Sequence, residues 1–255
     1  MNKIRELLTM GASQPSTFPR LPSNLANHDL AAGQTGAKLD TDDRQPVLPG
    51  ATQARGSNLQ PGTFLIVGLG NPGREYRSSR HNVGFMLLDR LAERLGVTFS
   101  RLESKALVTK ATDLENKLVL AKPQTYMNLS GQAVGSLVRF YKVPLEHLLV
   151  AYDEVDLPLG SLRLRPGGGS AGHNGMQSII EKLGTQQFPR LRVGVSRPPG
   201  RMEAADYVLQ DFSKGETELL EDTLNRAVEA VFIFMRDGID TAMNQFNPQG
   251  SGEIW

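Results

Sequence analysis

Acid–base side chains occur in this sequence at the points where apolar runs stop. His81 follows the first predicted strand, and Asp153 ends a later apolar run. A carboxylate that bonds one ring nitrogen of a histidine fixes its tautomer and leaves the other nitrogen free to accept a proton. Because the chain has no cysteine and no well-placed serine, we expect His81 to activate water rather than a side-chain nucleophile.

Two other interpretations of these histidines exist. A lone loop histidine is more often solvated or structural than catalytic. His81 and His173 with Asp153 and Asp156 also have the side-chain types of a metal site. His173, however, lies in a glycine run, and no His-x-x-x-His spacing occurs. We therefore predict no metal and no cofactor.

Amide side chains accompany the histidines in the same loops. Asn71, Asn128 and Asn174 each occupy a loop or a helix start, where capping is a common role, and Asn128 is expected to cap the helix after it. An amide also joins a donor to an acceptor, which suits a peptide backbone and an ester better than a charged metabolite. Tyr76 and Tyr126 offer rings on which a base could stack, although such aromatics commonly belong to a core.

Two glycine strings match general motifs without the context that those motifs need. Gly68-x-Gly70-x-x-Gly73 fits a dinucleotide fingerprint, but a polar run delays the helix that should begin at once. Gly168-x-Ser170-x-Gly172 fits a serine-hydrolase elbow, but the required acid and later histidine do not follow it. These glycines are better explained by close backbone approach or by positive φ.

Hydrophobic periodicity predicts the elements that position these loops. A continuous apolar run over residues 63–68 indicates a buried strand, and further strands are expected near 119–121, 147–152 and 191–195. Helical spacing covers residues 85–95, the stripe within 134–141, about 174–183, and 219–235. Strands alternating with helices indicate one α/β domain, whose strand ends gather binding groups in one crevice.

Composition sets the domain organisation. Of 255 residues, 39% are hydrophobic and 22% charged, which is ordinary for a globular protein. Residues 1–61 lack periodicity and are rich in Pro, Gly, Ser and Gln, so we predict a disordered N-terminal extension before a catalytic domain over 62–255. No run approaches the roughly 20 apolar residues of a membrane helix. A soluble, cytoplasmic protein is expected, with an organellar transit peptide as the alternative.

The net charge of +1 hides an uneven distribution. Ten acidic residues face three basic ones over 202–240, whereas seven basic residues face Glu181 over 161–201. Either one face is cationic and suits a polyanion, or the charges are scattered over solvated surfaces. The basic residues of the cationic stretch are Arg163, Arg165, Lys182, Arg190, Arg192, Arg197 and Arg201.

Taken together, the loops resemble the bacterial-type peptidyl-tRNA hydrolase family. Five segments match its motifs in order and spacing, and the likeness runs from about Thr63 to Phe246. The five segments are Val67–Gly73, Tyr76 with Arg80–Gly84, Lys122–Gly131, Asp153–Pro158 and Gly167–Gly175.

The resemblance implies a single α/β domain, monomeric, with a mixed, twisted sheet surrounded by helices. It also implies hydrolysis of the ester between a peptidyl group and tRNA, which recycles tRNA after aborted translation. His81 matches the catalytic base, Asp153 the acid that orients it, and Asn71 the amide that distinguishes N-blocked substrate. The other matches are to substrate or tRNA binding: Asn128 and Asn174 as amides, Tyr76 and Tyr126 as aromatic lining, and Arg163, Arg165 and Arg192 as phosphate contacts.

Two rival functions use the same fold or crevice. A non-catalytic RNA-binding relative is one, and a small-molecule esterase that ignores RNA is the other. Retention of His81, Asp153 and the three asparagines favours the enzyme. One departure from the family pattern is Tyr152, which replaces a histidine that many members carry before the aspartate.

Overall fold

The computed structural model of the chain describes residues 62–248. The predicted extension over 1–61 therefore lies outside the described residues, as do residues 249–255. Within the described part, an α/β domain is built on one seven-stranded sheet with the order β2-β3-β4-β1-β5-β7-β6. This arrangement agrees with the predicted fold class.

The middle of the sheet is parallel and its edges are antiparallel. Four neighbouring strands run in the same direction: β4 (Asn116–Pro123), β1 (Thr63–Gly68), β5 (Leu148–Glu154) and β7 (Arg190–Gly194). On one side β2 (Arg101–Glu103) and β3 (Ala106–Asp113) form a hairpin that pairs with β4. On the other side β6 (Leu162–Arg165) pairs with β7. The sheet is therefore mixed.

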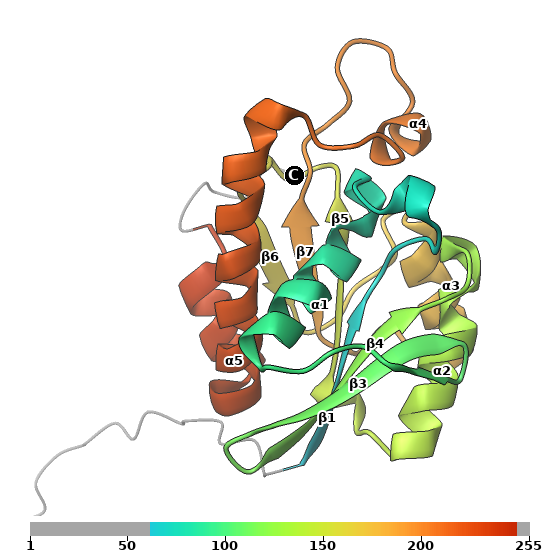
Figure 1. Ribbon diagram of the computed structural model, residues 1–255, viewed down its shortest axis with the longest axis vertical. Coiled ribbons are helices and arrows are strands. Elements are labelled where there is room, and N and C mark those ends of the chain that lie inside the picture. The colour runs from blue at the N-terminus through green and yellow to red at the C-terminus, as the bar shows by residue number, and fades with distance from the viewer. Residues whose placement is uncertain (1–61, 249–255) are drawn as a thin grey trace, which may run out of the picture. The chain divides into compact units, whose positions relative to one another are not determined.

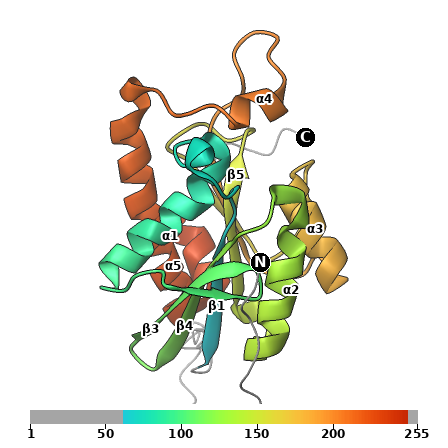
Figure 2. The ribbon, with the colours of Figure 1, turned by 45° about the vertical axis from the view of Figure 1, so that its right-hand side comes forward.

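Helices cover both faces of the sheet, as Figures 1 and 2 show. Side chains alternate along a strand, so Phe64 and Ile66 pack beneath α1 (Val83–Arg94) and α5 (Thr217–Phe246). Leu65 and Val67 pack on the opposite face beneath α2 (Ser130–Tyr141) and α3 (Asn174–Leu183). The short helix α4 (Ala204–Val208) lies at the end of the sheet toward which the parallel strands point (Figure 1).

Two glycines allow helix α1 to begin directly against the ends of the central strands. A Cβ at Gly68 would lie 2.1 Å from the carbonyl oxygen of Gly84, and one at Gly84 would lie 2.5 Å from the carbonyl oxygen of Ala151. No larger side chain fits either position without moving backbone. This close contact fixes the segment between β1 and α1, which carries His81.

The predicted buried strands and helices agree with the structure. The prediction missed the short or partly exposed strands, and it placed the end of one helix and the cap of another wrongly. Helix α5 extends past the predicted end at 235 and contains a break at Gly238, where φ is 84°. The hairpin β2–β3 and the edge strand β6 were not predicted. Asn128 does not cap α2, because a 3-10 helix, η3 (Met127–Leu129), precedes α2 and places Leu129 at its N-cap.

Within residues 62–248, no helix combines the length and the apolar character needed to cross a bilayer.

Candidate active site

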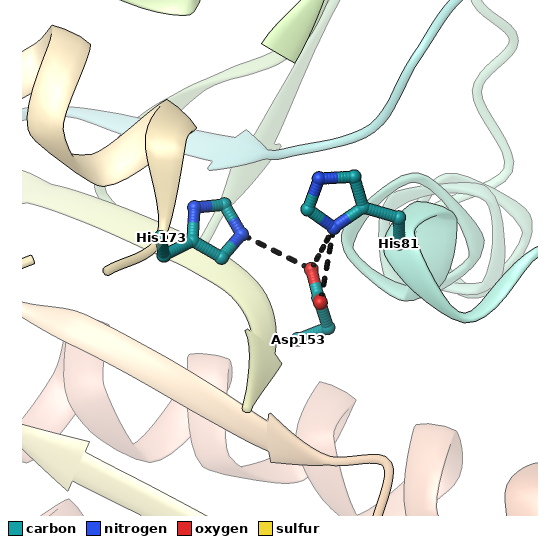
Figure 3. A group of neighbouring side chains, drawn as sticks. All are labelled: His81, Asp153 and His173. Carbon is teal, nitrogen blue, oxygen red and sulfur yellow. Dashed lines mark hydrogen bonds and ion pairs between the residues drawn. The ribbon is translucent and has the colours of Figure 1, made fainter. Parts of the chain in front are cut away.

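His81 and Asp153 meet at the carboxyl ends of the central strands. His81 lies in the 3-10 helix η2 (Arg80–Asn82), and Asp153 lies near the end of β5. Nδ1 of His81 is 2.8 Å from Oδ1 and 3.0 Å from Oδ2 of Asp153. A carboxylate only accepts, so Nδ1 is the nitrogen that carries the proton. Nε2 of His81 is then the basic nitrogen, and it points away from Asp153 (Figure 3).

The carboxyl group of Asp153 is held in its ionised form. Its side chain is only 2% exposed, and burial by itself would raise its pKa. The charges and hydrogen bonds of His173 and His81 outweigh burial and set the pKa of Asp153 below its usual value. Asp153 is therefore an anion that orients the imidazole of His81 and would stabilise positive charge on it.

His173 holds Asp153 from the other side. Its Nε2 lies 3.1 Å from Oδ1 of Asp153, while its Nδ1 accepts hydrogen bonds from the amides of Gly175 and Met176 at 3.1 and 3.2 Å. This histidine is the N-cap of α3. Because Nδ1 accepts from two amides, the ring proton must be on Nε2, which donates it to Asp153.

His81, Asp153 and His173 also have the spacing of a metal site, since their ligand atoms lie within 4.8 Å of one another. Binding a cation through Nε2 of His173 would require the ring proton to move to Nδ1. Two amide N–H groups already point at Nδ1, so that tautomer would place donors against a donor. The cluster is better suited to orienting His81 than to holding a metal.

Tyr152 packs against His173, and Arg190 holds the glycine loop that precedes this histidine. The ring of Tyr152, which is 1% exposed, meets the ring of His173 edge-on at 4.8 Å between centroids. Arg190 is fully buried on β7 and donates to the carbonyl oxygens of Gly169 and Gln186 at 2.9 and 2.8 Å. Tyr152, the departure noted in the sequence, thus packs directly against the histidine that bonds Asp153.

Asn71 is oriented by backbone contacts. Its Oδ1 accepts the amide of Met127 at 2.9 Å, so the amide orientation is unambiguous and Nδ2 is the end left for other partners. The side chain of Asn82 fixes the main chain of Asn71 through two hydrogen bonds. The backbone amide of Asn71 donates to Oδ1 of Asn82 at 2.8 Å, and Nδ2 of Asn82 donates to the backbone carbonyl of Asn71 at 2.9 Å. Asn71 therefore presents a donor.

A pocket of about 710 Å³ contains these groups. Asn128 and Asn174 are exposed along its wall, and no hydrogen bond within residues 62–248 holds either side chain. Tyr126 is 64% exposed at the same wall. The residues that line the pocket are Asn71, His81, Tyr126, Met127, Asn128, Asp153, Glu154, Val155, Ser170, Ala171, Gly172, His173, Asn174, Ala204, Ala205, Val208 and Leu209.

Four predicted site residues lie outside this lining. Tyr76 is half-buried in the 3-10 helix η1 (Arg74–Tyr76). Arg163 and Arg165 are half-buried on the edge strand β6, and Arg192 stands opposite Arg163 on β7. Arg192 bonds Glu154 at 3.2 Å, and Glu154 does line the pocket.

Residues 65–253 match the family described as peptidyl-tRNA hydrolase. The chain belongs to the peptidyl-tRNA hydrolase family. The resemblance drawn from the loops is thereby confirmed.

Known members of the family are similar to this chain over about three quarters of its length. The peptidyl-tRNA hydrolase of Chloroflexus aurantiacus is 52% identical over 186 residues, which is 72% of this chain and 99% of that protein. The chloroplastic peptidyl-tRNA hydrolase of Arabidopsis thaliana is 49% identical over 74% of this chain and 66% of its own length. The crystal structure of the Acinetobacter baumannii peptidyl-tRNA hydrolase aligns with a TM-score of 0.69 at 35% identity and covers 72% of this chain and 94% of its own.

Several residues that support His81, Asp153 and Asn71 in the structure had no predicted role of their own. His173 and Asn82 were not assigned roles, because nothing in the spacing showed that they contact Asp153 and Asn71. Histidine is not among the residue types that usually cap helices, so its position just before a helix start did not point to the capping role of His173. Arg190 carried no sign either, because a buried arginine on a strand is recognised only by its partners.

Proposed function

We propose that this protein hydrolyses the ester that joins a peptidyl group to the terminal ribose of tRNA. The observation that carries the proposal is the His81–Asp153 pair in a pocket lined by amide side chains. Membership of the peptidyl-tRNA hydrolase family supports this substrate over other esters.

The reaction needs a base for water and a donor for the leaving group. Nε2 of His81 takes a proton from water as the oxygen attacks the ester carbonyl carbon. The imidazolium that forms is stabilised by the adjacent carboxylate of Asp153. When the bond between the carbonyl carbon and the ribose oxygen breaks, His81 returns the proton to that oxygen, which becomes the ribose hydroxyl, so a free peptide and a free tRNA are released.

Amide groups supply the remaining roles. Asn174, the first residue of α3, supports the negative oxygen of the intermediate together with nearby backbone N–H groups, and Asn128 contacts the substrate from the wall of the same pocket. Asn71 donates through Nδ2 to a peptide carbonyl. A free, protonated α-amino group offers only donors, so it would face Asn71 donor against donor. This mismatch accounts for selection of N-blocked substrates.

The tRNA is held by charge rather than by sequence. Arg163 and Arg165 lie on the strand that leads into the glycine loop of the pocket, and we assign them, with Arg192, to phosphate contacts. Tyr126 lines the peptide or tRNA-end site, and Tyr76 contacts the tRNA from outside the lining. We further propose that the protein acts as a monomer in the cytoplasm. The chloroplastic relative from Arabidopsis thaliana supports the organellar alternative.

The test is cleavage of N-acetyl-aminoacyl-tRNA by the wild-type protein and by His81→Ala. We expect turnover in the presence of a chelator, and a loss of at least about 100-fold in kcat for the variant, since a general base contributes roughly that much. Binding of deacylated tRNA should be unchanged. Substantial residual hydrolysis would reject His81 as the base.

Two outcomes would favour the rival functions. A wild-type protein that binds tRNA without cleaving it would be an RNA-binding relative. A protein that cleaves model esters and is not inhibited by deacylated tRNA would be a small-molecule esterase.

A further inference from the structure

Arg80, the residue before His81, is a buried arginine with an ion-pair partner far along the chain. It is 6% exposed, and its two terminal nitrogens bond the two carboxylate oxygens of Glu216 at 3.0 and 2.8 Å. Glu216 ends the 3-10 helix η5 (Lys214–Glu216) directly before α5. A paired, bidentate contact of this kind fixes both orientation and distance.

The same guanidinium is also enclosed by two aromatic rings. Its central carbon lies 4.5 Å from the ring centroid of Tyr207 and 4.8 Å from that of Phe212. Tyr207 belongs to α4, and Phe212 lies between α4 and η5. Arg80 therefore contacts three successive parts of the segment that leads from α4 into α5.

Backbone hydrogen bonds also join residues 78–80 to residues 210–212. The amide of Arg80 donates to the carbonyl of Gln210 at 3.0 Å, and the amide of Phe212 donates to the carbonyl of Ser78 at 3.4 Å. On the other side, the hydroxyl of Tyr207 donates to the carbonyl of Val195, just past β7, at 3.0 Å.

Residues 204–212, here called the pocket roof, supply part of the wall of the pocket that contains His81. Ala204, Ala205, Val208 and Leu209 from this roof line the pocket together with His81. Tyr207 and Phe212, which Arg80 contacts, belong to this roof, so the contacts of Arg80 set the position of the roof relative to His81.

We propose that Arg80 is a positioning residue, which fixes the pocket roof and His81 in one register through its ion pair with Glu216. This inference rests on the proposed function for its catalytic consequence. Arg80 itself does not line the pocket, so it acts through its neighbours. Misplacement of His81 relative to a bound ester slows the chemical step without removing the tRNA-binding surface.

Glu216→Gln isolates the ion pair from the other role of Glu216. Oε2 of Glu216 also accepts the amide of Ser213 at 2.7 Å and completes a capping box, which glutamine can maintain. With that oxygen retained for Ser213, the amide NH₂ of glutamine would face the Arg80 guanidinium, donor against donor. The matched control is Glu221→Gln, which removes the pair that Glu221 forms with Arg90 between α5 and α1 at the surface.

The experiment measures kcat, affinity for deacylated tRNA, and backbone hydrogen exchange, at temperatures well below each variant's unfolding midpoint. For Glu216→Gln we expect kcat to fall by about 10- to 100-fold with unchanged tRNA affinity. Exchange should rise in residues 78–82 and 204–212 only. Glu221→Gln should match the wild type in all three, and Arg80→Lys, which keeps the charge without the bidentate fork, should behave as Glu216→Gln does.

Unchanged kcat in Glu216→Gln would overturn the proposal, whether or not exchange rises. Equal losses in Glu216→Gln and Glu221→Gln would also overturn it, because the effect would then be general. Hydrogen exchange requires no substrate, so unaltered exchange at the roof refutes the coupling independently of activity. A wild-type protein without hydrolytic activity would reject the proposed function alone.

Discussion

His173 contributes at the scale of a single residue because both of its ring nitrogens are committed. Nδ1 accepts hydrogen bonds from the backbone amides of Gly175 and Met176 in the first turn of α3, and Nε2 donates to Asp153. The helix terminus therefore determines which nitrogen carries the proton, and this proton in turn holds the carboxylate that orients His81. One imidazole links the start of a helix to the orientation of another imidazole.

Replacement of His173 by Asn tests this link. Asparagine can still cap α3 but is too short to reach Asp153, so the unfolding midpoint should stay near that of the wild type. We expect kcat to fall about tenfold with little change in KM, since a hydrogen bond to a charged group contributes about 1.5 kcal/mol. Steady-state kinetics with N-acetyl-aminoacyl-tRNA measure both constants. His173→Gln, whose longer amide can donate to Asp153, should recover part of the loss, and a wild-type kcat in His173→Asn would contradict the role.

At the scale of elements, the site is assembled where short 3-10 helices join strands to helices. η2 presents His81, and η3 places the amide of Met127 against Asn71. η5 presents Glu216 to Arg80. These turns are short, so their positions depend on contacts with distant segments rather than on their own hydrogen bonds.

The ion pair at η5 gives stability a specific pH dependence. The hydrogen bonds of Arg80 are the main cause that lowers the pKa of Glu216 from 4.5 to about 2. Because the folded-state pKa is the lower one, the pair contributes its full stability above pH 4.5, and this contribution disappears as the pH falls through about 2. Glu216→Gln has no such titration.

We therefore expect wild-type stability to fall more steeply than that of Glu216→Gln between pH 4.5 and about 2. Urea unfolding followed by circular dichroism at a series of pH values measures both curves. Asp153 titrates in both proteins, so its contribution cancels in the difference. Parallel curves over this range would show that the Arg80–Glu216 pair does not stabilise the fold.

At the scale of the whole molecule, one face of the sheet near its β6 edge carries arginines instead of apolar residues. Cross-strand register pairs Arg163 with Arg192 and Arg165 with Arg190, so all four lie on one face. Arg190 holds the glycine loop, and Arg192 bonds Glu154. Within residues 62–248, neither Arg163 nor Arg165 has a side-chain hydrogen bond or an ion pair, and both remain available to phosphate.

Arg165→Ala should weaken tRNA binding without altering the chemical step. We expect KM to rise at constant kcat, and the slope of log KM against log salt concentration to fall by about one, as loss of one phosphate contact requires. Kinetics at several salt concentrations measure this slope. Arg94→Ala, which removes an exposed arginine on α1, is the control and should leave the slope unchanged. An unaltered slope in Arg165→Ala would exclude a phosphate contact at this position.

The sequence by itself determined the buried strands, the main helices and the loops that carry chemistry. Apolar periodicity depends on burial of whole faces, so it was sufficient to place β1, β5 and β7. Loop residue types suggested His81 with Asp153 as an acid–base pair, and the motifs that these loops share with the family singled out Asn71. The hairpin β2–β3 and the edge strand β6 were not predicted, because partly exposed strands mix polar with apolar residues and so lack a clear hydrophobic pattern.

Only the tertiary structure decided which partners these residues have. His81 and Asp153 are far apart in the chain, and so are Arg80 and Glu216. The second pair forms only because α5, which follows Glu216, packs beside α1, which follows Arg80. Sequence spacing describes neighbours along one element, whereas a tautomer or an ion pair depends on atoms a few ångströms apart in space. The roles of His173 and Arg80 therefore follow from packing, which residue types alone do not encode.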